Sequence, residues 1–199
     1  MRGLLAEPAR QPKLGLYGSH ACAAKTHYHW PVKLIISARK DVAAIKLIAF
    51  DQSTTNTGWA VLEQETGALI DFGALHPQGE TNARIRRTVK QCIALCTKYR
   101  PTFVFIEGIQ IQRNPKVYEI LAKLQGTLEI CLEEQGYIVN VVRANEWRQR
   151  IGIKGRRRKE FKAAAMALVD DLYGDEAEGA TEDTCEAICF GRAFCDGDE

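Results

Sequence analysis

The stretch that most constrains the fold is residues 45–62, where a single carboxylate separates two apolar runs. Residues 47–50 are apolar and end at Asp51, a polar turn leads to Gly58, and a second apolar run begins at Trp59. Two such runs around a short polar turn predict a β-hairpin. Burying an acid at a strand end costs free energy unless a metal ion, a base or a capped turn pairs with it. An Asx turn is the alternative interpretation of Asp51, because Asp followed by Ser and Thr is common turn chemistry.

Length and charge indicate one domain preceded by an extension. The chain has 199 residues, and residues 1–44 hold seven basic and two acidic side chains, so they carry +5 and the remainder carries −3. We expect residues 1–44 to be a poorly structured basic N-terminal extension, with Cys22, His27 and His29 as tail residues rather than a metal site. Residues 45–199 are expected to form the functional domain. No apolar run approaches the ~18 residues that cross a membrane, so no membrane segment is expected.

The cysteine spacing favours core positions over disulfides or zinc. Cys92 and Cys96 are four residues apart, as are Cys185 and Cys189, and both pairs lie in helical patterns. Such residues are typical of apolar positions in a reducing compartment. No Cys-x-x-Cys pair occurs, so structural zinc is not expected.

Hydrophobic periodicity predicts an α/β fold with a mixed five-stranded sheet flanked by helices. The predicted strands are residues 46–51, 57–64, 68–75, 102–106 and 137–142, and the predicted helices are residues 80–99, 116–135, 157–172 and 181–194. The apolar stripe predicted to face the core is Val117, Leu121, Leu124, Leu128 and Cys131 in the second helix and Phe161, Ala165, Leu168 and Leu172 in the third.

Three further acids occupy comparable positions. Glu107 ends the apolar strand at 102–106, as Asp51 ends the first strand. Asp183 and Glu186 are three residues apart in the last helix and share one helix face. The alternative interpretation of Asp183 is a favourable helix-dipole contact behind an N-cap at Thr181. If the first and fourth strands are neighbours and the last helix packs across them, the four carboxylates converge.

Four converging carboxylates predict a metal site. Such groups repel one another and stay ionised only when divalent cations neutralise them. Oxygen ligands suit magnesium or manganese. Two such ions would clamp the attacking and leaving oxygens of a phosphodiester, and one of them would lower the pKa of the attacking water. The pattern therefore predicts phosphodiester hydrolysis without a serine or histidine nucleophile.

A dense basic stretch follows the fifth predicted strand. Residues 154–162 hold six cations in nine residues, and Arg143, Arg148 and Arg150 lie upstream. The alternative interpretation is a solvated helix start, but like charges at this density repel one another. Phosphate binding explains the density better, and we expect this stretch to bind nucleic acid.

Taken together, residues 46–194 resemble the RuvC-like Holliday junction resolvases of the ribonuclease H-like superfamily, and among these the phage-type members. The resemblance rests on Phe50-Asp51 and the turn to Ala60, on Ile106-Glu107, and on the segment from Asp183 to Ala187. It implies a ribonuclease H-like fold and a homodimeric, magnesium-dependent crossover junction endodeoxyribonuclease that nicks opposing strands of four-way and other branched DNA. One departure is the loop after Glu107, which lacks the aromatic wedge of the bacterial family.

The resemblance also implies residue roles. Two Mg²⁺ ions, for which Mn²⁺ could substitute, would be held by the catalytic acids Asp51, Glu107, Asp183 and Glu186, and Lys159 would be the catalytic basic residue. The residues expected to bind DNA are Arg113, Arg148, Arg150, Lys154, Arg156, Arg157, Arg158, Lys159 and Lys162. The expected location is the cytoplasm of a bacterial or phage-infected cell, and the helix at 116–135, with Tyr118 and Ile120, is a candidate dimer contact.

Three other functions fit parts of this pattern. Residues 50–55 also resemble the phosphate loop of actin-like ATPases and sugar kinases, but those enzymes need two such domains. A non-catalytic junction-binding protein of the same fold is a second alternative, although all four acids are present. A relative that acts on RNA is a third, because the predicted acid site does not itself distinguish the sugar.

Overall fold

The computed structural model describes residues 44–111 and 114–196. The strands are β1 (Lys46–Asp51), β2 (Thr57–Glu63), β3 (Leu69–Leu75), β4 (Phe103–Gly108) and β5 (Ile138–Arg143), and the helices are α1 (Thr81–Tyr99), α2 (Pro115–Glu133), α3 (Ala144–Arg150), α4 (Arg158–Tyr173) and α5 (Glu182–Arg192), with a 3-10 turn η2 (Gly174–Ala177) before α5. Cys22, His27 and His29 of the predicted extension lie outside the described residues.

The sheet is mixed, as predicted. Its strand order is β3-β2-β1-β4-β5. β1 pairs antiparallel with β2, placing Asp51 opposite Gly58, and parallel with β4, placing Phe50 opposite Ile106. The predicted hairpin is confirmed, and the two acid-ending strands are neighbours.

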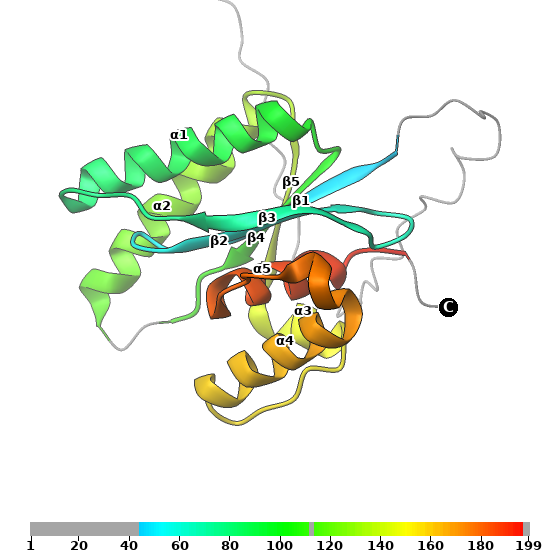
Figure 1. Cartoon of the computed structure of the whole chain (residues 1–199). Coiled ribbons are helices and arrows are strands. Elements are labelled where there is room, and N and C mark those ends of the chain that lie inside the picture. Colours follow the sequence, from blue (N-terminus) through cyan, green and yellow to red (C-terminus); the bar gives the residue numbers. More distant parts are fainter. Residues whose placement is uncertain (1–43, 112–113, 197–199) are drawn as a thin grey trace, which may run out of the picture. The chain divides into compact units, whose positions relative to one another are not determined.

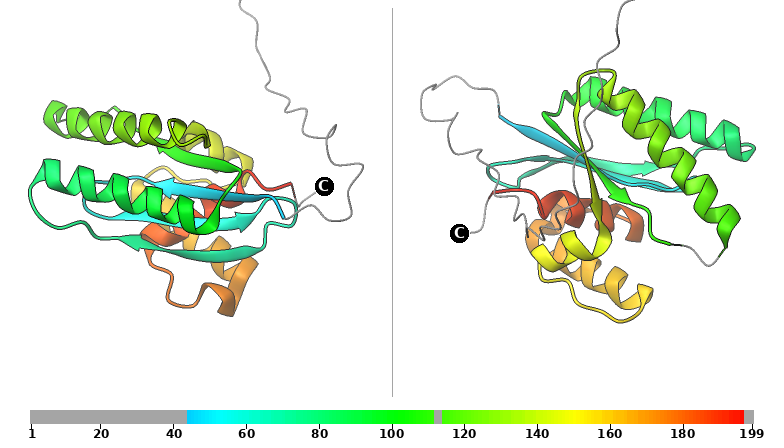
Figure 2. Two further views of the ribbon diagram at one scale, coloured as in Figure 1. Left: turned by 90° about the horizontal axis from the view of Figure 1, so that it is seen from above. Right: turned by 180° about the vertical axis from the view of Figure 1, so that it is seen from behind.

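Helices cover both faces of the sheet, with α1 and α2 on one face and α3, α4 and α5 on the other (Figures 1 and 2). The continuous apolar run of β1 follows from this layering, because Ile48 and Phe50 enter the core beneath α1 and α2 while Leu47 and Ala49 enter the core beneath α5. Side chains alternate along a strand. Asp51 therefore continues the row of Leu47 and Ala49 toward α5.

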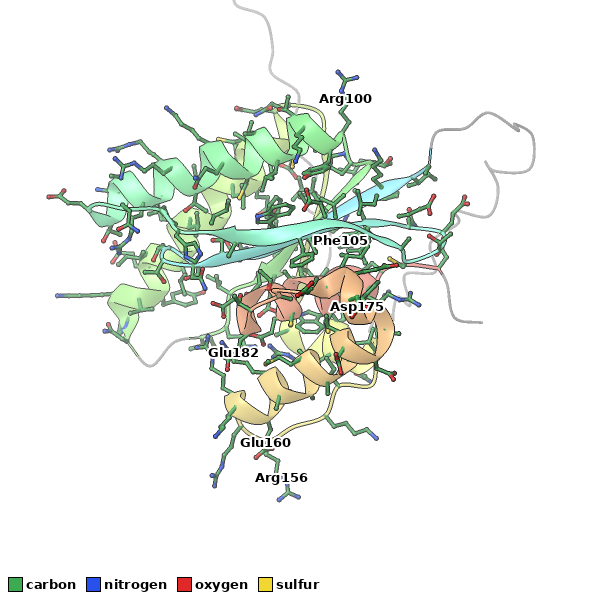
Figure 3. All side chains as sticks on the ribbon, viewed as in Figure 1. Arg100, Phe105, Arg156, Glu160, Asp175 and Glu182 are labelled. Atoms are coloured by element: carbon green, nitrogen blue, oxygen red, sulfur yellow. The ribbon has the colours of Figure 1, made fainter. Side chains whose placement is uncertain are left out.

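The same alternation applies to β4. Phe105 packs in the α5 core, and its ring lies between the sheet and α5 (Figure 3). Glu107, two residues further along, points to the same side. Adjacent parallel strands thus deliver Asp51 and Glu107 to one edge and one face of the sheet.

α5 packs closely on the sheet because two glycines make room for it. A Cβ on Gly58 would stand 2.2 Å from the backbone oxygen of Asp183, and a Cβ on Gly191 would stand 2.4 Å from Leu62 Cδ1. Thr181 caps the helix in a reciprocal capping box with Thr184. The beginning of α5 is therefore fixed directly beside the end of β1.

Two predicted core stripes differ from the structure at their ends. Val117 at the start of α2 is 41% exposed, and Leu172 at the end of α4 is 42% exposed. The residues that α2 buries most are Leu124, Leu128 and Leu132, and those of α4 are Ala165, Val169 and Tyr173. In both helices the buried residues are four positions apart. The predicted stripes alternate spacings of four and three, so their outer residues leave the face that contacts the sheet.

The basic stretch after β5 contains a helix that the sequence pattern did not predict. α3 has seven residues and buries Ala144 and Trp147. Two buried positions are too few to show helical periodicity, so the sequence indicates only a basic stretch here.

The cysteine prediction is confirmed among the described residues, where Cys92, Cys96, Cys185 and Cys189 are buried free thiols. No helix in residues 44–111 or 114–196 has both the length and the apolar character to span a membrane.

Candidate active site

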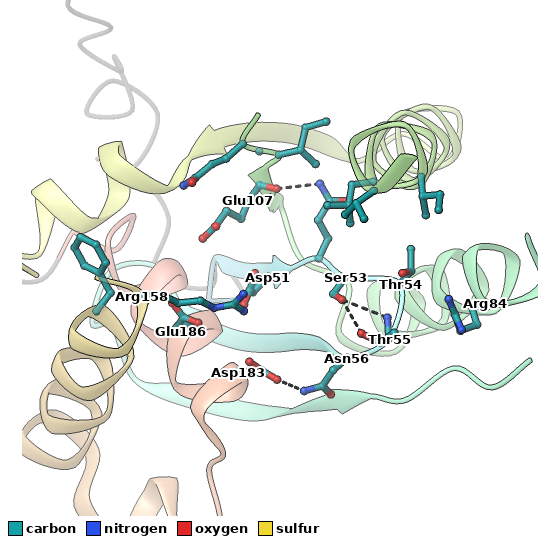
Figure 4. Close-up of a pocket in the computed structure, with 18 of the residues that line it drawn as sticks. Asp51, Ser53, Thr54, Thr55, Asn56, Arg84, Glu107, Arg158, Asp183 and Glu186 are labelled. Atoms are coloured by element: carbon teal, nitrogen blue, oxygen red, sulfur yellow. Dashed lines mark hydrogen bonds between the residues drawn. The ribbon is translucent and has the colours of Figure 1, made fainter. Parts of the chain in front are cut away.

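Carboxylates from β1 and α5 meet at the carboxyl end of β1. Oxygens of Asp51, Asp183 and Glu186 all lie within 4.8 Å of one another. Figure 4 shows these side chains facing one another, with Glu107 approaching from β4. The predicted convergence of acids from distant parts of the sequence is therefore present for Asp51, Asp183 and Glu186, whereas Glu107 does not belong to this 4.8 Å group. Thr57 Oγ1 donates a 2.6 Å hydrogen bond to the Ser53 backbone oxygen and closes the turn after Asp51.

Glu107 is held by a separate set of partners. Trp147 Nε1 donates a hydrogen bond of 2.8 Å to Glu107 Oε2. The backbone oxygen of Glu107 accepts a 2.9 Å hydrogen bond from Gln52 Nε2. Both the main chain and the carboxylate of this acid are thus fixed by neighbouring elements.

Burial and neighbouring acids raise the pKa of two site carboxylates, Asp51 and Glu107. Burial raises the pKa of Asp51 well above its usual range, and the charges of Glu107, Glu186 and Asp183 raise it further against the opposing charge of Arg148. Burial also raises the pKa of Glu107, although Arg148 and the Trp147 hydrogen bond oppose this shift. Added positive charge is therefore favourable in this cluster.

Basic side chains supply part of that charge. Lys162 Nζ lies 2.9 Å from both Asp183 Oδ1 and Glu182 Oε2. Asn56 Nδ2 donates to the other oxygen of Asp183. Arg148 Nη2 lies 3.0 Å from Glu186 Oε1, and both of these side chains are largely buried.

Burial lowers the pKa of Lys162, but its hydrogen bonds to Asp183 and Glu182 outweigh that effect and the pKa is raised. Lys162 is therefore charged at neutral pH and neutralises one edge of the cluster.

A cleft of about 680 Å³ opens over the carboxylates. Arg158 and Phe161 of α4 line this cleft, as do the apolar residues Ile109, Ile120 and Leu121. Arg84 of α1 lies at the far end from the acids (Figure 4). The acids are thus open to a ligand larger than an ion.

The donor set fits a hard divalent cation. The converging atoms are carboxylate oxygens, which are the ligands that Mg²⁺, Mn²⁺ and Ca²⁺ prefer. No histidine or cysteine belongs to this group of potential ligands within the described part of the chain. A zinc site of the usual nitrogen and sulfur type is not what these residues offer.

The match to known proteins agrees with this geometry. The sequence model of the family described as crossover junction endodeoxyribonuclease RuvC matches residues 47–190, which run from β1 into α5 and include all four acids. The chain belongs to the RuvC family. The resemblance seen in the sequence motifs is thereby confirmed.

Relatives within and near the RuvC family cover about three quarters of the chain. The crossover junction endodeoxyribonuclease RuvC of Lawsonia intracellularis is 23% identical over 149 residues, which are 73% of this chain and 89% of that relative. RuvC of T. thermophilus, solved in complex with a Holliday junction substrate, has a TM-score of 0.60 at 14% identity and covers 75% of this chain and 91% of its own.

The Fowlpox virus resolvase, solved with Holliday junction DNA, has a TM-score of 0.50 at 15% identity and covers 74% of this chain and 94% of its own. Both solved structures support the predicted ribonuclease H-like fold.

The basic residues predicted from the RuvC resemblance fall into two groups. Arg148, Arg158 and Lys162 lie at the carboxylates or line the cleft. Lys159, the predicted catalytic lysine, is exposed, and a lysine that does contact a site carboxylate is Lys162. The other exposed cations of this stretch are Lys154, Arg156, Arg157 and Arg150, the last with its guanidinium over the Phe194 ring.

Arg156 projects away from the sheet at the start of α4 (Figure 3). Arg113 lies outside the described residues.

Sequence reasoning missed the side chains that orient the acids. Trp147 and Asn56 each donate a hydrogen bond to an acid of the site, and Gln52 bridges to Gln125 on α2 at 3.1 Å. Asn56 and Gln52 lay inside the first-strand motif and could have been selected there. Trp147 carried no comparable signal, because a single aromatic in a basic stretch has no pattern.

Proposed function

We propose that this protein is a divalent-metal-dependent endonuclease that resolves four-way DNA junctions. The observation that carries the proposal is the meeting of Asp51, Asp183 and Glu186 within 4.8 Å, beside Glu107 and inside the span that the RuvC family matches. The relatives are named crossover junction endodeoxyribonucleases, and two neighbours in fold were solved with Holliday junction DNA.

We assign metal binding to the four acids and propose Mg²⁺ as the ion, two per site, with Mn²⁺ as a substitute. Bound magnesium would supply Lewis-acid chemistry, activating a water and stabilising the departing oxygen. The chain's own contribution is to align four carboxylates despite their mutual repulsion. Arg148 and Lys162 share that task, because each pairs with one acid of the cluster.

The cleft and the start of α4 are the proposed DNA surface. Arg158 lines the cleft, and its sequence neighbours Arg156, Arg157 and Lys159 are exposed. Cations in such a row neutralise phosphates along a strand and fix its register without reading sequence. A strand bound by Arg158 would lie at the cleft that opens over the carboxylates.

The decisive experiment compares Asp51→Asn with the wild type on a labelled four-way junction. We expect Asp51→Asn to bind the junction in Ca²⁺ with unchanged affinity and to lose cutting in Mg²⁺ by more than the ~100-fold typical of outer-shell changes. Asp170→Asn is the matched control, because Asp170 is an exposed acid on α4. Cutting by Asp51→Asn at the wild-type rate would refute the site.

A substrate panel separates this function from its alternatives. Four-way junction, flap, duplex and RNA–DNA hybrid are incubated with Mg²⁺, and products are resolved on denaturing gels. Paired nicks in the junction support the proposal, cutting of the hybrid alone supports an RNA-directed relative, and binding without cutting supports a non-catalytic protein. Phosphate transfer from ATP to a small molecule without any nicking would support the kinase alternative.

We further propose that the protein acts as a homodimer in a reducing cytoplasm. Exposed apolar side chains occur on α2 and on the edge strand β5, including Tyr118, Ile130, Ile138 and Val141. Two copies would bring two cleavage sites to one junction, as symmetric nicking needs. The free buried thiols of the described residues fit a reducing compartment.

A further inference from the structure

We propose that Trp147 is a positioning residue that fixes the Glu107 carboxylate and thereby sets the affinity of the site for divalent metal. This inference rests on the proposed function, because it concerns how one of the four acids is presented to an ion. Nothing in the acid motifs points to this tryptophan.

The contact is a buried hydrogen bond to a charged group. Trp147 is fully buried in α3, and its only polar side-chain atom, Nε1, donates to Glu107 Oε2 at 2.8 Å. The indole N–H is the one hydrogen-bond donor of this side chain. Its bond to a carboxylate is stronger than a bond to a neutral acceptor. One oxygen of Glu107 is therefore engaged in a hydrogen bond within the protein, and this bond fixes the orientation of the whole carboxylate.

The indole itself cannot turn easily. Its ring packs against Phe190 of α5 at a centroid distance of 5.7 Å, and the Arg148 guanidinium lies 4.8 Å from its centroid. The donor direction is thus set by α5 and by the arginine that pairs with Glu186. The same short helix orients two acids through consecutive residues.

The main chain at Glu107 is held independently. Gln52 Nε2 donates to the Glu107 carbonyl, and Gln125 Oε1 accepts both from Gln52 Nε2 and from the Ile109 backbone N–H, the last at 3.0 Å. With the backbone fixed, rotation about the side-chain bonds is the remaining freedom of Glu107. Trp147 removes that freedom, which is what an outer-shell partner of a metal ligand does.

The alternative is that Trp147 only fills space. Trp147→Phe separates the two roles, because phenylalanine keeps an aromatic ring against Phe190 and Arg148 while removing the N–H. Tyr173→Phe is the matched control. Tyr173 lies in the same apolar cluster, and its hydroxyl donates a 2.7 Å hydrogen bond to the Gly67 carbonyl, away from the acids.

Mn²⁺ binding to the full-length protein is measured by isothermal titration calorimetry for the wild type and for Trp147→Phe, Tyr173→Phe and Asp51→Asn. We expect Trp147→Phe to weaken Mn²⁺ binding by ~10–100-fold and Tyr173→Phe to leave it unchanged. The nicking rate of Trp147→Phe should recover as Mg²⁺ is raised, because the defect is in ion affinity. Wild-type affinity in Trp147→Phe would overturn the inference.

The Asp51→Asn arm tests the proposed function separately. Unchanged Mn²⁺ binding in Asp51→Asn means that the acid cluster is not the metal site, whereas loss there with no change in Trp147→Phe removes only the role of the tryptophan.

A second measurement needs no tryptophan variant and therefore does not depend on the folding of Trp147→Phe. In ¹⁵N-labelled protein, the indole N–H resonance of Trp147 is identified as the one that Glu107→Gln shifts. In the wild type this resonance should move with Mg²⁺ along the same saturation curve as Mg²⁺ binding measured by calorimetry. A resonance that stays fixed through saturation would contradict the proposal.

Discussion

The position of Asp51 suits metal binding but lowers the stability of the metal-free protein. Its carboxylate sits at a strand end among three other acids, so burial and neighbouring charge raise its pKa. An acid with a raised pKa in the folded state makes the protein less stable as pH rises from the ordinary aspartate pKa through the raised one. Without a metal ion, the folded protein therefore bears this repulsion at neutral pH.

Asp51→Asn should accordingly stabilise the metal-free protein. We expect a higher melting temperature than wild type in EDTA at about pH 8, and a difference that shrinks as pH falls toward about 4, where Asp51 is protonated in the wild type as well. Mg²⁺ should reverse the order, because only the wild type gains binding energy. Thermal unfolding across this pH range measures both effects, and a wild type that is the more stable protein in EDTA at pH 8 would contradict the assignment.

At this scale the acids could be predicted and their partners could not. Asp51 and Glu107 end apolar runs, and Asp183 and Glu186 share a helix face, so their positions follow from period and spacing. Lys162 and Trp147 reach the acids from elements whose approach is a tertiary property. The resemblance to the resolvases implies Lys159 as the catalytic lysine, whereas the lysine that contacts Asp183 is Lys162.

Among the elements, α5 has the most demanding placement. The Asp183 backbone oxygen occupies the space that a side chain at Gly58 would need. Gly58 has no positive φ, so its requirement is one of distance rather than backbone conformation. The helix can reach the acids of the sheet only because this strand position lacks a Cβ.

Gly58→Ala should push α5 away from β1. We expect the unfolding free energy to fall by about 1–3 kcal/mol and Mg²⁺ binding to weaken, because Asp183 and Glu186 move with the helix. Gly126→Ala is the control, since its Cβ would meet nothing within 4 Å in the middle of α2, and it should stabilise by about 0.5–1 kcal/mol. Chemical denaturation and calorimetry provide both readouts, and equal behaviour of the two variants would exclude the close-approach explanation.

The start of α4 gives an element-scale prediction about DNA. Arg156, Arg157 and Lys159 are exposed, and replacing all three with alanine should reduce the salt slope of junction binding by up to ~3, because each cation that pairs with a phosphate adds about one to the slope. Fluorescence anisotropy at several salt concentrations measures the slope.

The control for this prediction replaces Lys46, Lys90 and Lys98 with alanine, because these lysines lie on β1 and α1 rather than beside the cleft. An unchanged slope in the α4 variant, or an equal change in both variants, would refute the proposed DNA surface.

For the whole molecule, the topology was predictable because the apolar pattern of each strand indicates which of its faces are buried. Continuous apolar runs in β1 and β4 indicate strands covered on both faces, and helices between parallel strands supply that cover. α3 was not predictable, since seven residues with two buried positions give no period. The predicted core stripes were wrong at the ends of α2 and α4 for a related reason. Tertiary packing, rather than the sequence pattern, decides which terminal residues of a helix are buried.

The proposed homodimer is a property of the whole molecule. Ile130 on α2 is 57% exposed, and Ile138 on the edge strand is 49% exposed. We expect Ile130→Asp to convert a dimer into a monomer in light scattering after gel filtration, because a buried unpaired charge is costly. The monomer should still bind Mg²⁺ but lose paired nicking of the junction. An unaltered dimer mass for Ile130→Asp would place the contact elsewhere. Gln91→Asp is the control, because it adds the same single negative charge at an exposed position on α1.

The contribution of α5 to the acid cluster has a consequence for biosynthesis. The sheet strands leave the ribosome long before the segment that bears Asp183 and Glu186. A nascent or prematurely terminated chain that lacks α5 holds only two of the four proposed metal ligands. On the proposed function, we expect such a fragment to be unable to cut DNA.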